Sequence, residues 1–308
     1  MLFARKSLGV EIGPTGVGFA LLGGSAAAPR LERVSYRSLP PGCVRLSLRE
    51  PNILDPQAFV ATLKDAYNML LYRGTHVSLT LPDAIGRILL LDVEGRFKSR
   101  GEALDIIRWK LKKSMPFELA DSHLDYQQLR VRDNGDMALL VALVSRTVIG
   151  QYEELLAEAG FTPSRIDFNI FNLYRTFERR LAGQDDMALV TFHDGLLAVM
   201  IMHDDAPEFV RIKDLSGGTP SDGRVYLEIN SSFLVHRERF PERMPRQVAC
   251  IAPPDMGRDF CAMVAEITAC ETVLLETKSM VTPGDNAPAD QETLFFFTPA
   301  IGAAMRSL

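Results

Sequence analysis

The sequence predicts an α/β protein made of two similar halves, with a smaller unit inserted into the first half. Two observations lead to this prediction. A glycine-rich turn joins two β-favouring runs near the N-terminus, and the order of three strands, helix, strand and helix occurs twice, the second time from about residue 187. At 308 residues, the chain is long enough for two domains, each with its own core.

The N-terminal stretch at residues 8–22, LGVEIGPTGVGFALL, is predicted to form a β-hairpin. An apolar run that carries Glu11 enters a tight turn from Gly13 to Gly16, and an alternating run leaves it. Walker and Rossmann glycine loops instead open into a helix whose N-terminal N–H groups hold the phosphates. A strand-to-strand turn suits actin-like ATPases, in which hairpin backbone holds the phosphates. A turn that binds no ligand is the alternative.

The rest of the first half alternates between strands and helices. Strands are predicted at residues 30–39, 76–81 and 162–168, and helices at residues 57–72, between Ser145 and Gly160, and at 169–181. Asp55 is a plausible cap of the first helix, and Pro82 stops the second of these strands. The polar break at residues 182–186 divides the chain into domains at 1–185 and 186–308.

The inserted unit covers about residues 86–144. It is predicted as a strand at residues 87–93, a helix at 101–115, and a hairpin of strands 123–131 and 136–144 around an Asp-Asn-Gly turn.

The helix of this unit combines an apolar and a basic face. The apolar face carries Leu104, Ile107 and Leu111. Beside it lie Arg108, Lys112 and Lys113, with Trp109, the only tryptophan, nearby. A basic amphipathic helix can lie on a membrane or bind an acidic partner, whereas the simpler interpretation is a solvated face beside a buried one.

The second half repeats the order of the first. Strands are predicted at 187–192, 196–202, 208–212, 247–252 and 272–276, and helices at about 222–239, 256–269 and 299–308, with a polar loop at 282–292. This duplication is that of the actin-like (ASKHA) architecture, in which the interface of the two halves forms the nucleotide cleft.

Composition excludes several functions. A net charge of -5 provides no basic footprint for nucleic acid. The cysteines form no CxxC pair and the histidines lack metal-ligand spacing, so buried thiols and no metal site are expected. The cysteines are Cys43, Cys250, Cys261 and Cys270.

No apolar run is long enough to span a membrane. The N-terminal MLFARKSLG has too short an apolar run for a signal peptide, and the run at residues 137–144 is far below the roughly 20 residues that cross a bilayer. We therefore expect a cytoplasmic chain that meets a membrane only through a partner.

Several short motifs, in order, resemble the PilM-type proteins of type IV pilus assembly, which are related to FtsA and to the cytoplasmic part of GspL. The motifs are LGVEIG at 8–13, LP at 81–82, IRWKLKKSMPF at 107–117, LDY at 124–126, AG at 159–160, RID at 165–167, NLY at 172–174, LEI at 227–229 and AIGAAMR at 300–306. The inserted unit stands where that branch has its own subdomain.

The resemblance implies a nucleotide site that has degenerated. The positions that correspond to the family's Mg-ATP site are Glu11, Gly13, Thr15, Gly16, Gly217 and Gly218. Glu11 replaces the usual Asp, and Pro14 lacks an N–H group that would hold phosphate.

Further departures lie in the second half. Thr191 and His193 stand where the family has Asp and Gly, and Pro253 and Pro254 replace glycines near the adenosine. The extra helical segment expected after Gly218 is missing, so the second half is shortened. We therefore expect no catalytic residues and no cofactor.

The resemblance implies an assembly protein that binds the cytoplasmic peptide of a PilN-like inner-membrane protein, with the pilus motor ATPases as further candidate partners. In the family this peptide lies between the first subdomain and the inserted one. The candidate contact residues are Ile107, Leu111, Met115 and Phe117. One alternative is a working ATPase that binds ATP and magnesium through Glu11, Thr15 and Gly16. A sugar kinase of the same fold lacks an evident catalytic Asp.

Overall fold

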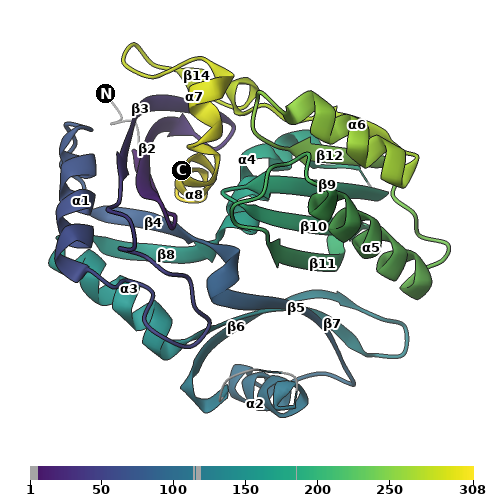
Figure 1. Cartoon of the computed structure of the whole chain (residues 1–308). Coiled ribbons are helices and arrows are strands. Elements are labelled where there is room, and N and C mark those ends of the chain that lie inside the picture. The colour runs from purple at the N-terminus through teal and green to yellow at the C-terminus, as the bar shows by residue number, and fades with distance from the viewer. Residues whose placement is uncertain (1–5, 114, 116–118, 185) are drawn as a thin grey trace.

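The computed structural model describes residues 6–113, 115, 119–184 and 186–308. Within these residues the strands form three sheets (Figure 1). One sheet belongs mainly to the first half, one to the second half and one to the inserted unit, and the inserted sheet lies beneath the other two in Figure 1. None of the described helices is long and apolar enough to cross a membrane.

The first sheet confirms the predicted hairpin. Its strand order is β14-β3-β2-β1-β4-β8. The strands are β1 (Ser7–Ile12), β2 (Gly16–Ser25), β3 (Ala28–Ser38), β4 (His76–Leu81), β8 (Thr162–Phe168) and β14 (Thr282–Pro283). β1 and β2 pair antiparallel from Ser7↔Leu22 to Ile12↔Val17, while β4 and β8 extend the sheet in parallel.

Helices cover both faces of this sheet. α1 (Pro56–Asn68) and α3 (Arg146–Glu158) lie on one face, and α4 (Asn169–Leu181) and α8 (Thr298–Met305) on the other. The predicted cap of α1 is confirmed, because the Asp55 carboxylate accepts a hydrogen bond from the Ala58 N–H at 3.0 Å.

α8 packs unusually close to its neighbours. A β-carbon on Gly9 would overlap the backbone oxygen of Ala300, and one on Gly302 would overlap that of Asn172. The missing side chains thus allow α8 to touch β1 and α4 directly.

The second sheet has the order β11-β10-β9-β12-β13, and its central strands are buried on both faces. Its strands are β9 (Asp186–His193), β10 (Leu196–His203), β11 (Ala206–Asp214), β12 (Gln247–Ile251) and β13 (Glu271–Leu274). α5 (Gly223–Arg239) and α6 (Gly257–Thr268) pack on the outer face with Ala188 and Val190, whereas Met187 and Leu189 join the core that includes α4. Alternation along β9 therefore sends every second side chain into the space between the two large sheets.

The order of elements confirms the predicted duplication. β1-β2-β3-α1-β4-α3-β8-α4 corresponds to β9-β10-β11-α5-β12-α6-β13, apart from the insertion. Residues 215–222, all of which are described, connect β11 to α5 without a helix.

The inserted unit is a three-stranded sheet covered by one helix. Its strands are β5 (Gly86–Val93), β6 (Ser122–Val131) and β7 (Met137–Ser145), in the order β5-β7-β6. α2 (Arg100–Leu111), capped by Ser99, packs Ile107 and Leu111 on the sheet. The predicted end at Met115 was too late, because α2 ends at Leu111, and Pro116 restricts the backbone only at Met115 and does not explain this earlier end.

The C-terminal segment differs most from the prediction. The polar loop expected at residues 282–292 contains β14 and the start of α7 (Gln291–Phe295), which is capped by Asp290. Three short 3-10 helices were not predicted: η1 (Asp83–Ile85), η2 (Leu119–Asp121) and η3 (Thr277–Ser279). The cysteines are free thiols, and Cys270 is half-buried whereas the other three are buried as expected.

Candidate functional site

The first hairpin turn is closed by its own backbone. The Gly13 N–H donates to the Gly16 carbonyl at 2.9 Å, and the Thr15 carbonyl accepts from the Leu39 N–H at 2.8 Å. Pro14 is half-buried and Thr15 is exposed. The backbone N–H of Gly13 is therefore already used in a hydrogen bond within the turn, at the place where the resemblance implies phosphate binding.

The second hairpin turn lies against the first. Asp194 and Gly195 both have positive φ (49° and 75°), as a two-residue type I′ turn requires. A β-carbon built on Gly13 would lie 2.8 Å from Asp194 Oδ2. The structure therefore places the Asp194 carboxylate beside the first turn.

The glycines at 217 and 218 follow the second turn. The Leu215 N–H donates to the Gly195 carbonyl at 2.9 Å, and the Gly218 N–H donates to the Leu215 carbonyl at 2.9 Å. Gly217 is exposed with φ at 79°. These two hydrogen bonds hold the loop at residues 215–218 against the second turn.

A buried polar cluster lies between the two large sheets, below these turns. It consists of Glu11, Thr80, Asp83, Asn169 and His193. Glu11 and His193 are 6% and 7% exposed. Thr80 Oγ1 donates to Asn169 Oδ1 at 2.7 Å, and Asn169 Nδ2 lies 3.4 Å from Glu11 Oε1.

Burial decides the charge of this cluster. It raises the pKa of Glu11 well above its ordinary value, and the nearby Asp194 carboxylate raises it further. Burial also lowers the pKa of His193 to about 4. Burial thus disfavours the charged form of each partner across the 3.7 Å separation between His193 Nδ1 and Glu11 Oε1.

These features do not fit bound magnesium and phosphate. Such a site uses ionised carboxylates and free backbone N–H groups. Burial favours the protonated form of Glu11, Gly13 donates within its own turn, and Pro14 has no N–H. Among the described residues, no group of three or more His, Cys, Asp or Glu side chains is placed to hold a metal ion.

A groove of about 340 Å³ separates the first sheet from the inserted sheet. We name it the strand-edge groove, because β8 and β6, which line it, each form the edge of a sheet. Its apolar lining includes Leu81, Ile85, Ala142, Ile149, Ile166 and Phe171. Its titratable lining consists of His123, Asp125, Glu153, Arg165 and Asp167.

The residues predicted for partner contact lie elsewhere. Ile107 and Leu111 are buried between α2 and the opposite face of the inserted sheet, and Met115 packs against the same core. Phe117 lies outside the described residues. The apolar periodicity that singled out Ile107 and Leu111 is that of a core-facing stripe, so their side chains offer no surface to a partner in this conformation.

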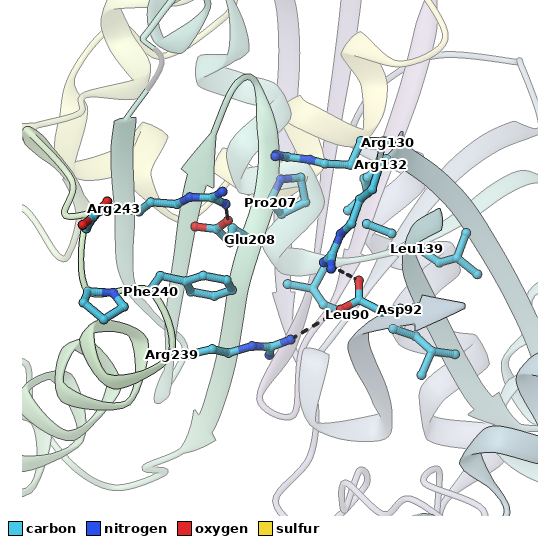
Figure 2. A pocket seen from close by; sticks show the side chains of 15 residues that line it. Leu90, Asp92, Arg130, Arg132, Leu139, Pro207, Glu208, Arg239, Phe240 and Arg243 are labelled. Carbon is cyan, nitrogen blue, oxygen red and sulfur yellow. Dashed lines mark hydrogen bonds and ion pairs between the residues drawn. The ribbon is translucent and has the colours of Figure 1, made fainter. Parts of the chain in front are cut away.

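A second cavity, of about 570 Å³, lies between the inserted sheet and the second half (Figure 2). We name it the arginine-lined cleft, after Arg130, Arg132, Arg239 and Arg243. Phe240 lies at its wall, and the guanidinium carbons of Arg239 and Arg243 lie 5.1 and 5.8 Å from the centre of its ring.

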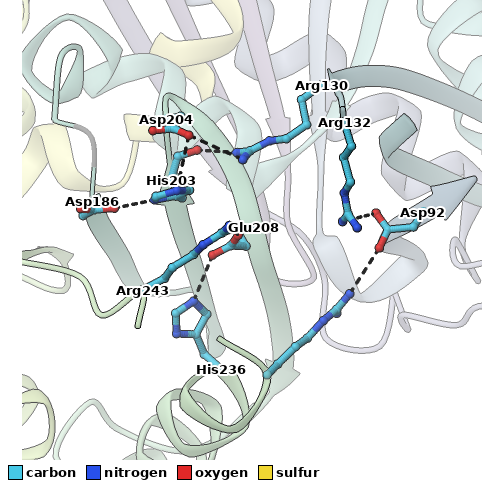
Figure 3. Close-up of polar contacts among 10 residues, drawn as sticks. Asp92, Arg130, Arg132, Asp186, His203, Asp204, Glu208, His236 and Arg243 are labelled. Carbon is cyan, nitrogen blue, oxygen red and sulfur yellow. Dashed lines mark hydrogen bonds and ion pairs between the residues drawn. The ribbon is translucent and has the colours of Figure 1, made fainter. Parts of the chain in front are cut away.

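Each of these arginines contacts an acidic or carbonyl partner (Figure 3). Arg132 bonds to Asp92 at 2.7 Å, and Arg239 lies 4.0 Å from the same carboxylate. Arg243 pairs with Glu208. Because the charges are already paired, we interpret the cleft as a joint between the inserted unit and the second half.

Arg130 makes a hydrogen bond across this joint. It extends from β6 and donates to the backbone carbonyl of His203 on β10 at 2.6 Å, with Asp204 at 3.8 Å (Figure 3). His203 Nδ1 in turn lies 2.6 Å from Asp186 Oδ1 on β9. The joint thus ties the inserted sheet to two strands of the second sheet.

Comparison with known proteins confirms the predicted fold. No protein-family model matches the chain, and no curated protein matches its sequence. A "PilM-PilN type IV pilus biogenesis complex" matches with a TM-score of 0.79 and 19% identity, over 97% of this chain and 98% of that one.

Two more distant structures share the fold. The cytoplasmic domain of EpsL, an inner membrane component of the type II secretion system of Vibrio cholerae, matches with a TM-score of 0.53 and 11% identity, over 96% of this chain and 95% of that one. A Bacteroides thetaiotaomicron protein "with actin-like ATPase fold and unknown function" matches with a TM-score of 0.50 and 9% identity, over 91% and 93%. The chain therefore has the actin-like fold.

Proposed function

We propose that this protein is an assembly factor of a type IV pilus or a related secretion machine, which binds the short cytoplasmic tail of a PilN-like inner-membrane protein. The single observation that carries the proposal is the strand-edge groove, on a chain whose fold matches the PilM–PilN complex over nearly its whole length. Under this proposal the protein is cytoplasmic and reaches the inner membrane through its partner, with pilus motor ATPases as further candidate partners.

The chemistry of the groove suits an extended peptide. β8 pairs only with β4 and β6 only with β7, so each strand has one side without a strand partner among the described residues. A peptide can add to such an edge through backbone hydrogen bonds, while apolar pockets hold alternate side chains. Ala142, Ile166 and Phe171 supply the apolar part here.

We further propose that the protein acts without hydrolysing ATP. The burial of Glu11, which raises the pKa of its carboxyl group, and the internal use of the Gly13 donor support this proposal, because both oppose the binding of a magnesium-bound triphosphate.

Filling the groove tests the peptide proposal. Ala142 faces the groove from β7 and is half-buried, so Ala142→Phe should occupy the space that the peptide needs. We expect a synthetic tail of the PilN-like protein encoded beside this chain to bind wild type without nucleotide, and Ala142→Phe to weaken binding by at least about tenfold, or about 1.4 kcal/mol. Fluorescence anisotropy of a labelled tail measures both.

Ala138→Phe is the matched control. Ala138 lies four residues earlier on the same strand and lines the arginine-lined cleft instead. Equal loss of binding in both variants, or no binding to wild type, would contradict the proposal.

A working ATPase is the second candidate function, favoured by the close opposition of the turns at Gly13 and Asp194. Our proposal predicts no heat of binding when Mg-ATP is titrated into the protein at micromolar concentrations. The reason is that each lost charge-assisted contact weakens binding by about 1.5–3 kcal/mol. A dissociation constant in the micromolar range, or nucleotide retained through purification, would support the ATPase instead.

A further inference from the structure

We infer that the outer face of α2 binds an anionic lipid surface, which gives the protein a membrane contact of its own. This face consists of Trp109 and of Lys112 and Lys113, which lie just beyond the helix end. The inference rests on the proposed function, since it adds a second contact at the membrane that carries the peptide partner.

The side chain of Trp109 points away from the protein. Ile107 and Leu111, two residues to either side, are buried against the inserted sheet, whereas Trp109 is 77% exposed. With 3.6 residues per turn, the indole therefore lies on the side of α2 opposite the core. A large exposed aromatic ring is unfavourable in water, and tryptophan is enriched at the interface between lipid and water.

The surroundings of Trp109 are basic in an acidic protein. Residues 94–113 include seven basic and three acidic residues, whereas the whole chain has a net charge of -5. Lys112 and Lys113 are exposed, and within the described residues no salt bridge joins either to a carboxylate, whereas Lys110 donates to the Asp92 carbonyl of β5 at 3.1 Å. Positive charge next to an indole complements an anionic bilayer, which offers both phosphate groups and an interface for the ring.

The position of α2 is compatible with peptide binding. The strand-edge groove and α2 lie on opposite faces of the inserted sheet, and α2 forms the lower edge of the molecule in Figure 1. A helix packed on a sheet adds about 20 Å between the bilayer and the groove, which six or seven extended residues span. A short tail and the face of α2 can therefore bind at the same time, and each raises the effective concentration of the other.

The single tryptophan makes the test specific. Tryptophan emission of this chain reports only on Trp109, the single tryptophan of its 308 residues. We expect vesicles rich in phosphatidylglycerol to shift this emission to the blue and to sediment the protein at low salt, and lipids with brominated acyl chains to quench it. Lys112→Glu with Lys113→Glu should weaken vesicle binding by at least about tenfold.

The control reverses the same number of charges elsewhere. Lys64 and Arg73 are exposed on and after α1, so the double variant Lys64→Glu with Arg73→Glu should bind vesicles like wild type. No emission shift with phosphatidylglycerol, an equal shift with phosphatidylcholine alone, or equal loss in both double variants would overturn the inference. Vesicle binding is measured without peptide and peptide binding without vesicles, so either proposal can fail while the other stands.

Discussion

Asp83 shows how a single buried carboxyl group links pH to the fold. Its Oδ1 accepts a hydrogen bond from the Ile170 N–H at 3.1 Å, in the first turn of α4, where the helix dipole favours negative charge. The residue is only 5% exposed, and burial nevertheless raises its pKa to about 7. Loss of solvation therefore outweighs the favourable helix end at this position.

Asp83 should make the protein less stable as the pH rises. Because its pKa is raised in the folded state, the folded chain binds the proton more tightly than the unfolded chain. The resulting stabilisation is full below about pH 4 and is lost as the pH rises to about 7. Asp83→Asn keeps an acceptor for Ile170 and removes this titration.

We expect the free energy of unfolding of Asp83→Asn, relative to wild type, to increase by at least about 1 kcal/mol between pH 5 and pH 8. Urea unfolding at both pH values measures it. Glu158→Gln, an exposed substitution in α3, is the control and should show no such change. A difference between Asp83→Asn and wild type that is the same at both pH values would show that Asp83 does not titrate in this range.

At the scale of elements, the packing of α8 depends on glycine. A β-carbon on Gly302 would overlap the backbone oxygen of Asn172 in α4, and backbone has little freedom to move away. Gly302→Ala should therefore lower the free energy of unfolding by about 1–3 kcal/mol.

Gly150→Ala provides the contrast within a helix. Gly150 lies inside α3, where a β-carbon meets no atom within 4 Å. This variant should be more stable by about 0.5–1 kcal/mol, because alanine favours the helix over glycine. Thermal unfolding of both variants is the measurement, and equal stability of Gly302→Ala and wild type would refute the close packing of α8.

Local sequence patterns predicted the helices and strands well, but they did not predict which strands lie at the edges of the sheets. α4 and β4 were predicted with their observed bounds because apolar periodicity and a following proline or break are local signals. β14 was missed because its two residues are a strand only through pairing with Arg30 and Leu31, far away in the sequence. The helix α7 was also missed, although Asp290 is of a residue type typical of a helix N-cap and could have indicated where the helix begins.

The candidate sites show the same contrast between features that local sequence patterns predict and features that depend on the arrangement of the sheets. Glu11 and His193 were singled out by their motifs, and strand alternation could have placed both on inner faces. The strand-edge groove could not be predicted, because it depends on which strands end two different sheets. Ile107 and Leu111 were chosen for partner contact from a pattern that also describes a core stripe, and the structure places them in the core.

At the scale of the whole molecule, the inserted unit lies against both halves, and cavities separate it from each. The strand-edge groove opens toward the first sheet and the arginine-lined cleft toward the second half. Both are lined by β6 and β7, so a peptide bound in the groove contacts the same strands that form the joint further along the same face of the inserted sheet. The orientation of the inserted unit therefore depends on the contacts at the joint.

Arg130 should control that orientation. It is the described arginine that bonds from β6 to the backbone of β10, whereas Arg132 pairs with Asp92 inside the inserted unit. Removal of Arg130 leaves the His203 carbonyl without this charged donor, which should cost about 1.5–3 kcal/mol locally. We expect Arg130→Ala to speed amide hydrogen exchange in β6 and around residues 203–207, measured by mass spectrometry, while Arg132→Ala leaves residues 203–207 unchanged. Faster exchange there in both variants, or in neither, would show that the joint does not depend on Arg130.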